Sequence, residues 1–306
     1  MFKKEMINRQ QIYEDLNAGL KSERSEVLKK NLRKNLPLIS STGGLRGVTG
    51  DFAGKHVAVI GAGPSLDKNI PYLKKYRDRI DFVYLATDMA LRPLLVSGIK
   101  PRFVITCETT PADFFSDLDT EGIHLLSFCC SSPSNLRKWR GDISFYNWMI
   151  EGELYTDLWD RAGRDLGSVA TGSIVTTQAV SIAMGCRPAS ILLVGNDMGF
   201  YDRFYARGTV NSEKRLLNSL RLNPEVNIEL NTARRGRFYE IRRNGALFYT
   251  NNQFLAAKYW LEDLFGKTPC PVIDCSEPGC SEGKVARMEL KEYLDSVDKK
   301  RRRGRR

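Results

Sequence analysis

A glycine-rich turn near the start of the chain has the residue types that bind phosphate. Residues 56–60 are apolar and rich in β-branched side chains, which is typical of a buried parallel strand. The letters GAGPS follow, and apolar residues then recur at helical spacing. Glycines let a ligand approach the backbone, and a helix N-terminus attracts anions. The pattern predicts a nucleotide-phosphate cradle, made of Gly61, Ala62, Gly63, Pro64 and Ser65.

This turn departs from the dinucleotide-binding fingerprint. Leu66 stands where the third glycine would be, and no acidic residue ends a strand about 20 residues further on. NAD is therefore disfavoured, and a glycine-rich turn without a ligand is the alternative to a phosphate site. If the site is correct, Gly63→Val should lose nucleotide binding but keep the fold, because the added side chain would occupy the space of the phosphate.

Acidic residues follow three other predicted strands. Asp88 follows strand 82–86, Glu108 follows strand 103–107, and the pair Asn196 and Asp197 follows strand 190–194. Ligands of open α/β sheets bind beyond the carboxyl ends of the strands. Carboxylates there could accept a proton, bind a ribose or hold Mg²⁺, with helix capping as the alternative. We predict all three acids to be catalytic, and Asp88 and Glu108 to be the ligands if a metal ion is used.

Two further segments could contact a substrate. Gly172, Ser173 and Thr176 offer N–H groups and hydroxyls at the start of a predicted helix, 174–184, where capping alone is the alternative. The loop 198–208 is dense in aromatic residues and arginine. It could close over a base or sugar, with arginines on phosphate, or be a packed surface loop. Its candidate contacts are Arg203, Tyr205 and Arg207.

No histidine is expected in the site. The chain has two histidines, His56 and His124, and each lies at the start of a predicted strand, opposite the carboxyl ends. A Ser-His-Asp arrangement is therefore excluded, and a general base would have to be a carboxylate or the substrate itself.

Strands and helices that could position these residues alternate from residue 51 onward. The alternation predicts an α/β fold with a doubly wound, mostly parallel, Rossmann-like sheet. Residues 1–50 are expected to be a helical arm followed by a linker at 37–50, and residues 51–285 the nucleotide-binding domain. Asn244 and Gly245 form a hairpin signal, which predicts a small β insertion at about 223–250. Residues 286–306 are expected to be a C-terminal helix and a basic tail.

Composition narrows the class of protein. The 306 residues carry a net charge of +11, and seven positive charges lie in residues 299–306. Such a tail is either solvated or in contact with an acidic surface such as nucleic acid or anionic lipid. No apolar run is long enough for a membrane span, and residues 1–10 lack a secretory leader. The seven cysteines include no C-x-x-C pair, which favours reduced thiols in the cytoplasm over zinc.

The combined motifs resemble the 6-hydroxymethylpterin diphosphokinase MptE-like domain family, which includes the Maf motility-associated flagellin glycosyltransferases. The resemblance covers roughly residues 50–285, and the turn is also similar to the GxGPS loop of bacterial sialyltransferases. An N-terminal helical arm fits the Maf arrangement. The motifs that carry the resemblance are GAGPSLD, ATDMA, SGIKPRFVI, ATGSIVTTQAVSIAMGC, ILLVGNDMGF and IDCSEPGCSEG.

The resemblance implies nucleotide contacts for the glycine turn and the 172–176 segment, and acidic roles for Asp88, Glu108 and Asp197. Two residues depart from the pattern. Glu108 stands alone where paired aspartates would be expected in the pterin enzymes, and Tyr205 stands where a histidine is common. Both departures disfavour the hypothesis of a diphosphokinase. The second also means that a glycosyltransferase would lack the histidine expected as its general acid or base.

The resemblance implies a cytoplasmic transferase without a tightly bound cofactor. The first hypothesis is a glycosyltransferase that takes a CMP-activated, nonulosonate-type sugar and modifies a protein or surface glycan. The alternatives are ATP-dependent diphosphate transfer to a pterin alcohol, with the acids holding Mg²⁺, and a non-catalytic nucleotide-binding module. Association into an oligomer is a further expectation.

Overall fold

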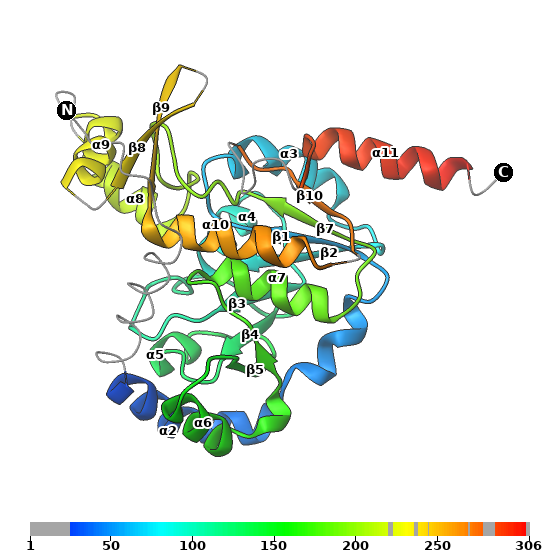
Figure 1. Ribbon diagram of the computed structural model, residues 1–306, viewed down its shortest axis with the longest axis vertical. Coiled ribbons are helices and arrows are strands. Elements are labelled where there is room, and N and C mark those ends of the chain that lie inside the picture. Colours follow the sequence, from blue (N-terminus) through cyan, green and yellow to red (C-terminus); the bar gives the residue numbers. More distant parts are fainter. Residues whose placement is uncertain are drawn as a thin grey trace.

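The computed structural model describes residues 25–219, 223–235, 238–243, 245–268, 270–277 and 285–303. Within these ranges one sheet has nine strands in the order β11-β10-β7-β1-β2-β3-β4-β5-β6, and its paired strands are parallel (Figure 1). This confirms the predicted α/β fold. The strands are β1 (His56–Ile60), β2 (Phe82–Thr87), β3 (Phe103–Thr106), β4 (His124–Phe128), β5 (Ile143–Trp148), β6 (Ser168–Val169), β7 (Ser190–Val194), β10 (Val272–Asp274) and β11 (Ala286–Arg287).

Helices cover both faces of this sheet, which is why its central strands are almost continuously apolar. Helices α7 and α10 pass in front of the sheet in Figure 1, and α10 packs on α7. The helices are α2 (Ser25–Thr42), α3 (Leu66–Tyr76), α4 (Asp88–Val96), α5 (Pro133–Leu136), α6 (Glu153–Ala162), α7 (Val175–Gly185), α8 (Val210–Leu217), α9 (Glu225–Arg235), α10 (Asn252–Phe265) and α11 (Leu290–Arg303), with 3₁₀ turns at Leu45–Asp51 and Arg164–Leu166.

The order of the strands reverses at β1, which lies between β2 and β7. The chain runs outward from β1 to β6 and then returns to the other side of β1. Ile60 is in register with Ala86 on one side and with Val194 on the other, so the three strands end level. The segments that follow them therefore meet at one edge of the sheet, the switch point where ligands of this architecture bind.

The N-terminal helix continues further than the sequence predicts. Residues 37–42 were expected in a linker, yet α2 runs through Pro37 to Thr42. Proline removes one helical hydrogen bond, and docking on the domain compensates for it. The side-chain amide of Asn31 donates to the carbonyl oxygens of Thr109 at 2.8 Å and Cys130 at 3.0 Å. Asn35 binds the carbonyls of Cys129 and Ser131 in the same way, at 2.9 Å each.

The predicted β insertion contains a helix as well as the hairpin. Strands β8 (Phe238–Arg243) and β9 (Ala246–Asn251) pair antiparallel as the hairpin signal predicts, and Gly245 has a φ of +82°. Residues 225–235, however, form α9. Leu230 and Ala233 of this helix pack on Phe200, so one face of the segment is buried at helical spacing.

The C-terminal segment also differs from the prediction. Ala286 and Arg287 extend the sheet as β11, and the last helix begins only at Leu290. This helix reaches Arg303, inside the predicted tail. The side chains of residues 300–306 lie outside the described residues, so the role of the tail stays a prediction.

The histidines lie away from the switch point, as predicted. The ring of His56 contacts the Ser190 hydroxyl at 2.8 Å, and that of His124 contacts the Ser144 hydroxyl at 2.9 Å. In the described parts of the chain, no cluster of three or more His, Cys, Asp or Glu side chains is arranged for a metal ion. None of the described helices is long and apolar enough to cross a membrane.

Candidate functional site

The Asp197 carboxylate lies directly against the glycine turn. The N–H of Ser65 donates to Asp197 Oδ2 at 2.8 Å, and the Ser65 hydroxyl donates to Oδ1. The N–H of Glu277 also donates to Oδ1, at 3.1 Å. Asp197 is only 3 % exposed, so these three donors bind a carboxylate that is almost removed from water.

Most donors of the turn are already engaged inside the protein. The N–H of Gly61 donates to the Val194 carbonyl and that of Gly63 to the Gly195 carbonyl, each at 2.8 Å. Phosphate contact through Ser65 would require the displacement of Asp197. Binding of phosphate by the turn therefore stays a prediction. The hydrogen bonds of the structure connect the turn after β1 to the end of β7.

Burial raises the pKa of Asp197 to about 7. The hydrogen bonds from Ser65 and Glu277 favour the ionised form and oppose this shift, while the charge of Asp274 adds to it. Removal from water outweighs the donors because a buried charge loses more hydration than they restore.

Replacing Asp197 with asparagine should lower the free energy of unfolding by about 1–3 kcal/mol, the cost of a buried donor left unpaired. The new amide NH₂ has to face one of the three donors that now surround the carboxylate. Because the folded pKa of about 7 is above the unfolded value, protonation stabilises the wild type at pH 5, and this stability is lost as the pH rises through 7. The deficit of the variant should therefore be larger at pH 5 than at pH 8 in urea unfolding. An equal deficit at both pH values would contradict the assignment.

Asn196 and Thr176 join the two halves of the switch point. The Asn196 amide donates to the carbonyls of Val59 at 2.9 Å and Val194 at 3.1 Å, and its oxygen accepts from the Thr176 hydroxyl at 2.8 Å. The polar groups expected to contact nucleotide thus tie β1 and β7 to the first turn of α7. Their nucleotide role stays a prediction.

Gly172 and Ser173 are held by α10. A Cβ on Gly172 would lie 2.5 Å from Cγ of Trp260, so packing of the indole already requires glycine there. Ser173 has a φ of +80°, and its hydroxyl donates to the Gln253 carbonyl at 3.0 Å. Gln253 returns a bond from Nε2 to the Ser173 carbonyl at 3.0 Å. Contacts with α10 therefore hold this segment in place.

Two cavities open at this edge of the sheet. The switch-point cavity, about 250 Å³, is lined by residues of the glycine turn, 195–199 and the 204–205 loop, and by the N-terminus of α10. The aromatic cavity, about 540 Å³, lies beside it over β3 and β5. Both are lined by Asp88, Met89, Ile174, Val175 and Gln253.

The predicted site residues divide between these cavities. The predicted residues that line the switch-point cavity are Gly61, Ala62, Gly63, Asp88, Thr176, Asn196, Asp197 and Tyr205. Those that line the aromatic cavity are Asp88, Glu108, Gly172 and Ser173. Four predicted residues line neither of the two, namely Pro64, Ser65, Arg203 and Arg207.

Asp88 lies at the junction of the two cavities, as the first residue of α4. Its Oδ2 accepts from the Thr106 hydroxyl at 2.7 Å and its Oδ1 from the Met89 N–H at 2.8 Å. Burial raises the pKa of Asp88 to about 6, with a smaller contribution from the charge of Glu108, while the Thr106 bond opposes the shift. A carboxylate with a pKa in this range is ionised near neutral pH and basic enough to take a proton.

Glu108 is the second carboxylate of the aromatic cavity. Its Oε1 accepts from the N–H of Thr110 at 2.8 Å and from the Thr110 hydroxyl at 2.6 Å. Mg²⁺ can be held by one or two carboxylates when substrate phosphates complete its shell. The two acids fit such a site only together with a bound substrate, so the metal stays a prediction.

The two arginines of the 198–208 loop contact α3 and line neither of these two cavities. Arg203 forms an ion pair with Asp67, and the N–H of Arg207 donates to the same carboxylate at 3.0 Å. The N–H of Ala206 donates to the Ala62 carbonyl at 2.8 Å. The loop therefore covers the glycine turn and brings Tyr205 to the switch-point cavity.

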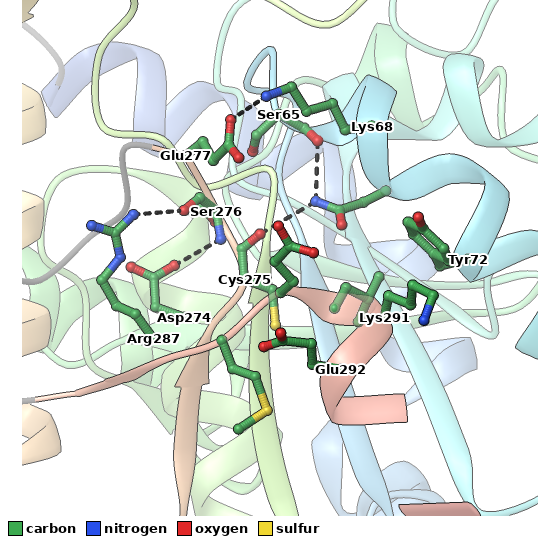
Figure 2. A pocket seen from close by; sticks show the side chains of 14 residues that line it. Ser65, Lys68, Tyr72, Asp274, Cys275, Ser276, Glu277, Arg287, Lys291 and Glu292 are labelled. Atoms are coloured by element: carbon green, nitrogen blue, oxygen red, sulfur yellow. Dashed lines mark hydrogen bonds and ion pairs between the residues drawn. The ribbon is translucent and has the colours of Figure 1, made fainter. Parts of the chain in front are cut away.

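A third cavity, about 540 Å³, lies between α3, the end of β10 and the start of α11 (Figure 2). Figure 2 shows Lys68 and Glu277 paired across it. Its wall includes Ser65 and Glu277, the two residues that bind Asp197. Asp197 therefore lies in the partition between this cavity and the switch-point cavity.

The sequence analysis did not predict the aromatic side chains that line the aromatic cavity. Trp148 is the last residue of β5, so it lies at the edge of the sheet where the strand-end rule places ligand contacts. Trp260 lies in the middle of α10, and only the packing of that helix brings it to the site. Phe114 and Gln178 carried no signal of their own, because aromatic and amide residues occur widely in loops and helices.

A solved structure shares the architecture. A Maf glycosyltransferase from Magnetospirillum magneticum AMB-1 is 17% identical, with a TM-score of 0.52, over 78% of this chain and 33% of that one. This chain thus spans about a third of that protein. A thiamine pyrophosphokinase from Bacillus subtilis is 15% identical over 62% of this chain and 61% of its own, but at a TM-score of 0.24 nothing here rests on it. No curated protein matches the chain significantly.

A family model also matches the sequence. The model for the 6-hydroxymethylpterin diphosphokinase MptE-like family matches residues 30–203. This range includes the glycine turn, all three candidate acids and the start of α7. The match covers more than half of the chain, and the chain belongs to the 6-hydroxymethylpterin diphosphokinase MptE-like family.

Proposed function

We propose that this protein is a glycosyltransferase that uses a nucleotide-activated sugar, with a CMP-nonulosonate as the favoured donor and a protein or surface glycan as acceptor. The observation that carries the proposal is the meeting of two cavities at the buried carboxylate of Asp88. A transferase has to hold two substrates with their reacting atoms in contact. Membership of the MptE-like family and the fold shared with a Maf glycosyltransferase support this reading.

In this proposal the donor nucleotide binds in the switch-point cavity. No lysine or arginine is among the described residues that line either cavity. Charge on the departing phosphate would therefore be stabilised by backbone N–H groups and by the N-termini of α4 and α7. Both helices begin at residues that line this cavity.

The reaction proceeds by substitution at the anomeric carbon. The acceptor hydroxyl oxygen forms a bond to that carbon, and the bond from the carbon to the phosphate oxygen breaks. The electron pair leaves with the nucleotide, and the proton of the hydroxyl passes to Asp88. The raised pKa of Asp88 suits this task because it is nearer to the working pH than that of an ordinary aspartate.

Diphosphate transfer from ATP is the second candidate. It is favoured by the two carboxylates of the aromatic cavity, Asp88 and Glu108, which could share Mg²⁺ with a triphosphate. The cytoplasmic location, the oligomer and the contact of the basic tail with acidic surfaces stay predictions.

A thermal-shift panel of CMP, CDP, UDP, GDP, ATP with Mg²⁺, and a CMP-sugar tests the proposal. CMP and the CMP-sugar should stabilise the protein, by about 2.7 kcal/mol at 100 times the dissociation constant. Ala62→Leu should abolish the shift, because Ala62 lines the switch-point cavity and a larger side chain would fill it. Ala53→Leu, at an exposed position outside the cavities, should keep it. A shift with ATP and Mg²⁺ alone would favour diphosphate transfer, and no shift with any nucleotide would remove both enzymes.

A further inference from the structure

The aromatic cavity has walls of two chemical kinds. Phe114, Trp148 and Trp260 come from the loop after β3, the end of β5 and the middle of α10. Polar side chains also line it, among them the carboxylates of Asp88 and Glu108 and the amides of Gln178 and Gln253. Large apolar surfaces with a few fixed polar groups are typical of small-molecule sites, and the volume of about 540 Å³ is in the usual range.

The aromatic cavity offers an anionic ligand no basic side chain among its described lining residues. Its described lining residues include two acids and no lysine or arginine. A phosphate or carboxylate placed there would meet like charge without a counter-ion, and such contacts strongly disfavour binding. A neutral ligand avoids this repulsion.

Trp148 is held rigidly at the base of the cavity. Its ring stacks on Phe128 with centroids 3.9 Å apart and planes 4° from parallel. Its indole N–H donates to Gln178 Oε1 at 3.0 Å, and the Tyr146 hydroxyl donates to the same oxygen at 2.6 Å. Gln178 Nε2 donates to Thr171 Oγ1 at 3.1 Å, which fixes the amide from the other end. A preorganised aromatic surface costs little to order when a ligand binds.

We propose that the aromatic cavity binds an uncharged sugar ring, and that this ring is the glycosyl acceptor. The electron-rich faces of aromatic rings attract the weakly positive C–H groups of a pyranose, while amides and carboxylates bind its hydroxyls. Asp88 lies where the cavity meets the donor side, so a ring hydroxyl at the junction reaches the proposed base. The enzyme would then extend a neutral glycan. This inference rests on the proposed function.

Binding of neutral and acidic sugars of equal size tests the proposal. Methyl galactoside, methyl N-acetylglucosaminide and methyl galacturonate would be titrated into the full chain with and without CMP, followed by tryptophan fluorescence and ligand-observed NMR. We expect a neutral glycoside to bind at least about tenfold more tightly than the uronate, or about 1.4 kcal/mol. Phe114→Ala should weaken that binding about tenfold and leave the CMP thermal shift unchanged, because Phe114 lines only the aromatic cavity of the two. Tyr72→Ala, a half-buried aromatic residue on α3 outside both cavities, is the control and should change neither.

The outcomes separate this inference from the proposed function. A neutral glycoside that binds together with CMP and with the CMP-sugar supports an acceptor site. A glycoside that is displaced by the CMP-sugar but not by CMP would show that the cavity holds the donor sugar, and would overturn the acceptor assignment. Binding of the uronate as tightly as the neutral sugar, no binding of either neutral glycoside, or insensitivity to Phe114→Ala would also overturn it. Loss of the CMP response alone, with sugar binding retained, would count against the donor assignment only.

Discussion

Asp88→Asn is expected to lower turnover about a hundredfold or more, the range for losing a general base. The substitution keeps the size of the side chain and an oxygen that can accept from the Thr106 hydroxyl, now 2.7 Å away. It removes the charge that takes the proton of the acceptor. Binding of CMP should change by less than about threefold, because a base acts on the acceptor and not on the nucleotide. Steady-state kinetics with a CMP-sugar, and CMP titration of the same preparations, measure the two effects.

A metal ligand would respond differently from a base. If Asp88 holds Mg²⁺, excess Mg²⁺ should restore part of the lost turnover and CMP binding should weaken. If it is a base, neither should occur. Glu108→Gln is the matched variant, since it alters the other carboxylate of the aromatic cavity and should cost less. Turnover of Asp88→Asn within about threefold of wild type would remove Asp88 from the chemistry.

Gly63→Val is expected to destabilise the fold, in contrast to the prediction from sequence that it would block phosphate and leave the fold intact. A Cβ on Gly63 would lie 2.5 Å from Asp197 Oδ2 and 2.8 Å from the Gly195 carbonyl oxygen. Overpacking of this kind costs about 1–3 kcal/mol or more. Here it also pushes against a buried carboxylate that holds Ser65, so we expect the upper end or beyond. Urea unfolding of the variant and wild type measures the difference.

Gly47→Val is the control for this substitution. A Cβ on Gly47 meets nothing within 4 Å, so its stability should stay within about 0.5 kcal/mol of wild type, as for surface changes in general. A Gly63→Val protein as stable as wild type, yet unable to bind CMP, would restore the simpler view that the glycine serves the ligand alone.

The sequence by itself determined the architecture and the edge of the sheet where chemistry is expected. Residues 57–60 and 191–194 are short, continuously apolar runs, and such runs are typical of strands buried on both faces. Each run ends at glycine, which marks the strand end within a residue. The position of Asp88 and Asp197 at the carboxyl edge follows from these local signals, because parallel strands all end on the same side.

Local signals failed where long-range contacts decide the structure. Pro37 and the Ser-Thr-Gly composition around it predict a linker, but the bonds from Asn31 and Asn35 to the ends of β3 and β4 hold α2 on the domain and the helix continues. Residues 225–235 became helical because one side of them packs against Phe200. Neither partner is near in sequence, so no window of the chain contains the cause.

Only the tertiary structure decided what the polar residues at this edge do. Composition cannot tell that Ser65 binds Asp197, that Gly172 is glycine because Trp260 lies against it, or that Arg203 pairs with Asp67. Nor can it tell that Asp88 is shared by two cavities while Asp197 lies in a partition. The local sequence sets which backbone conformation a residue adopts, whereas distance, burial and hence pKa depend on atoms from distant parts of the chain, such as Ser65 and Asp197, which are 132 residues apart.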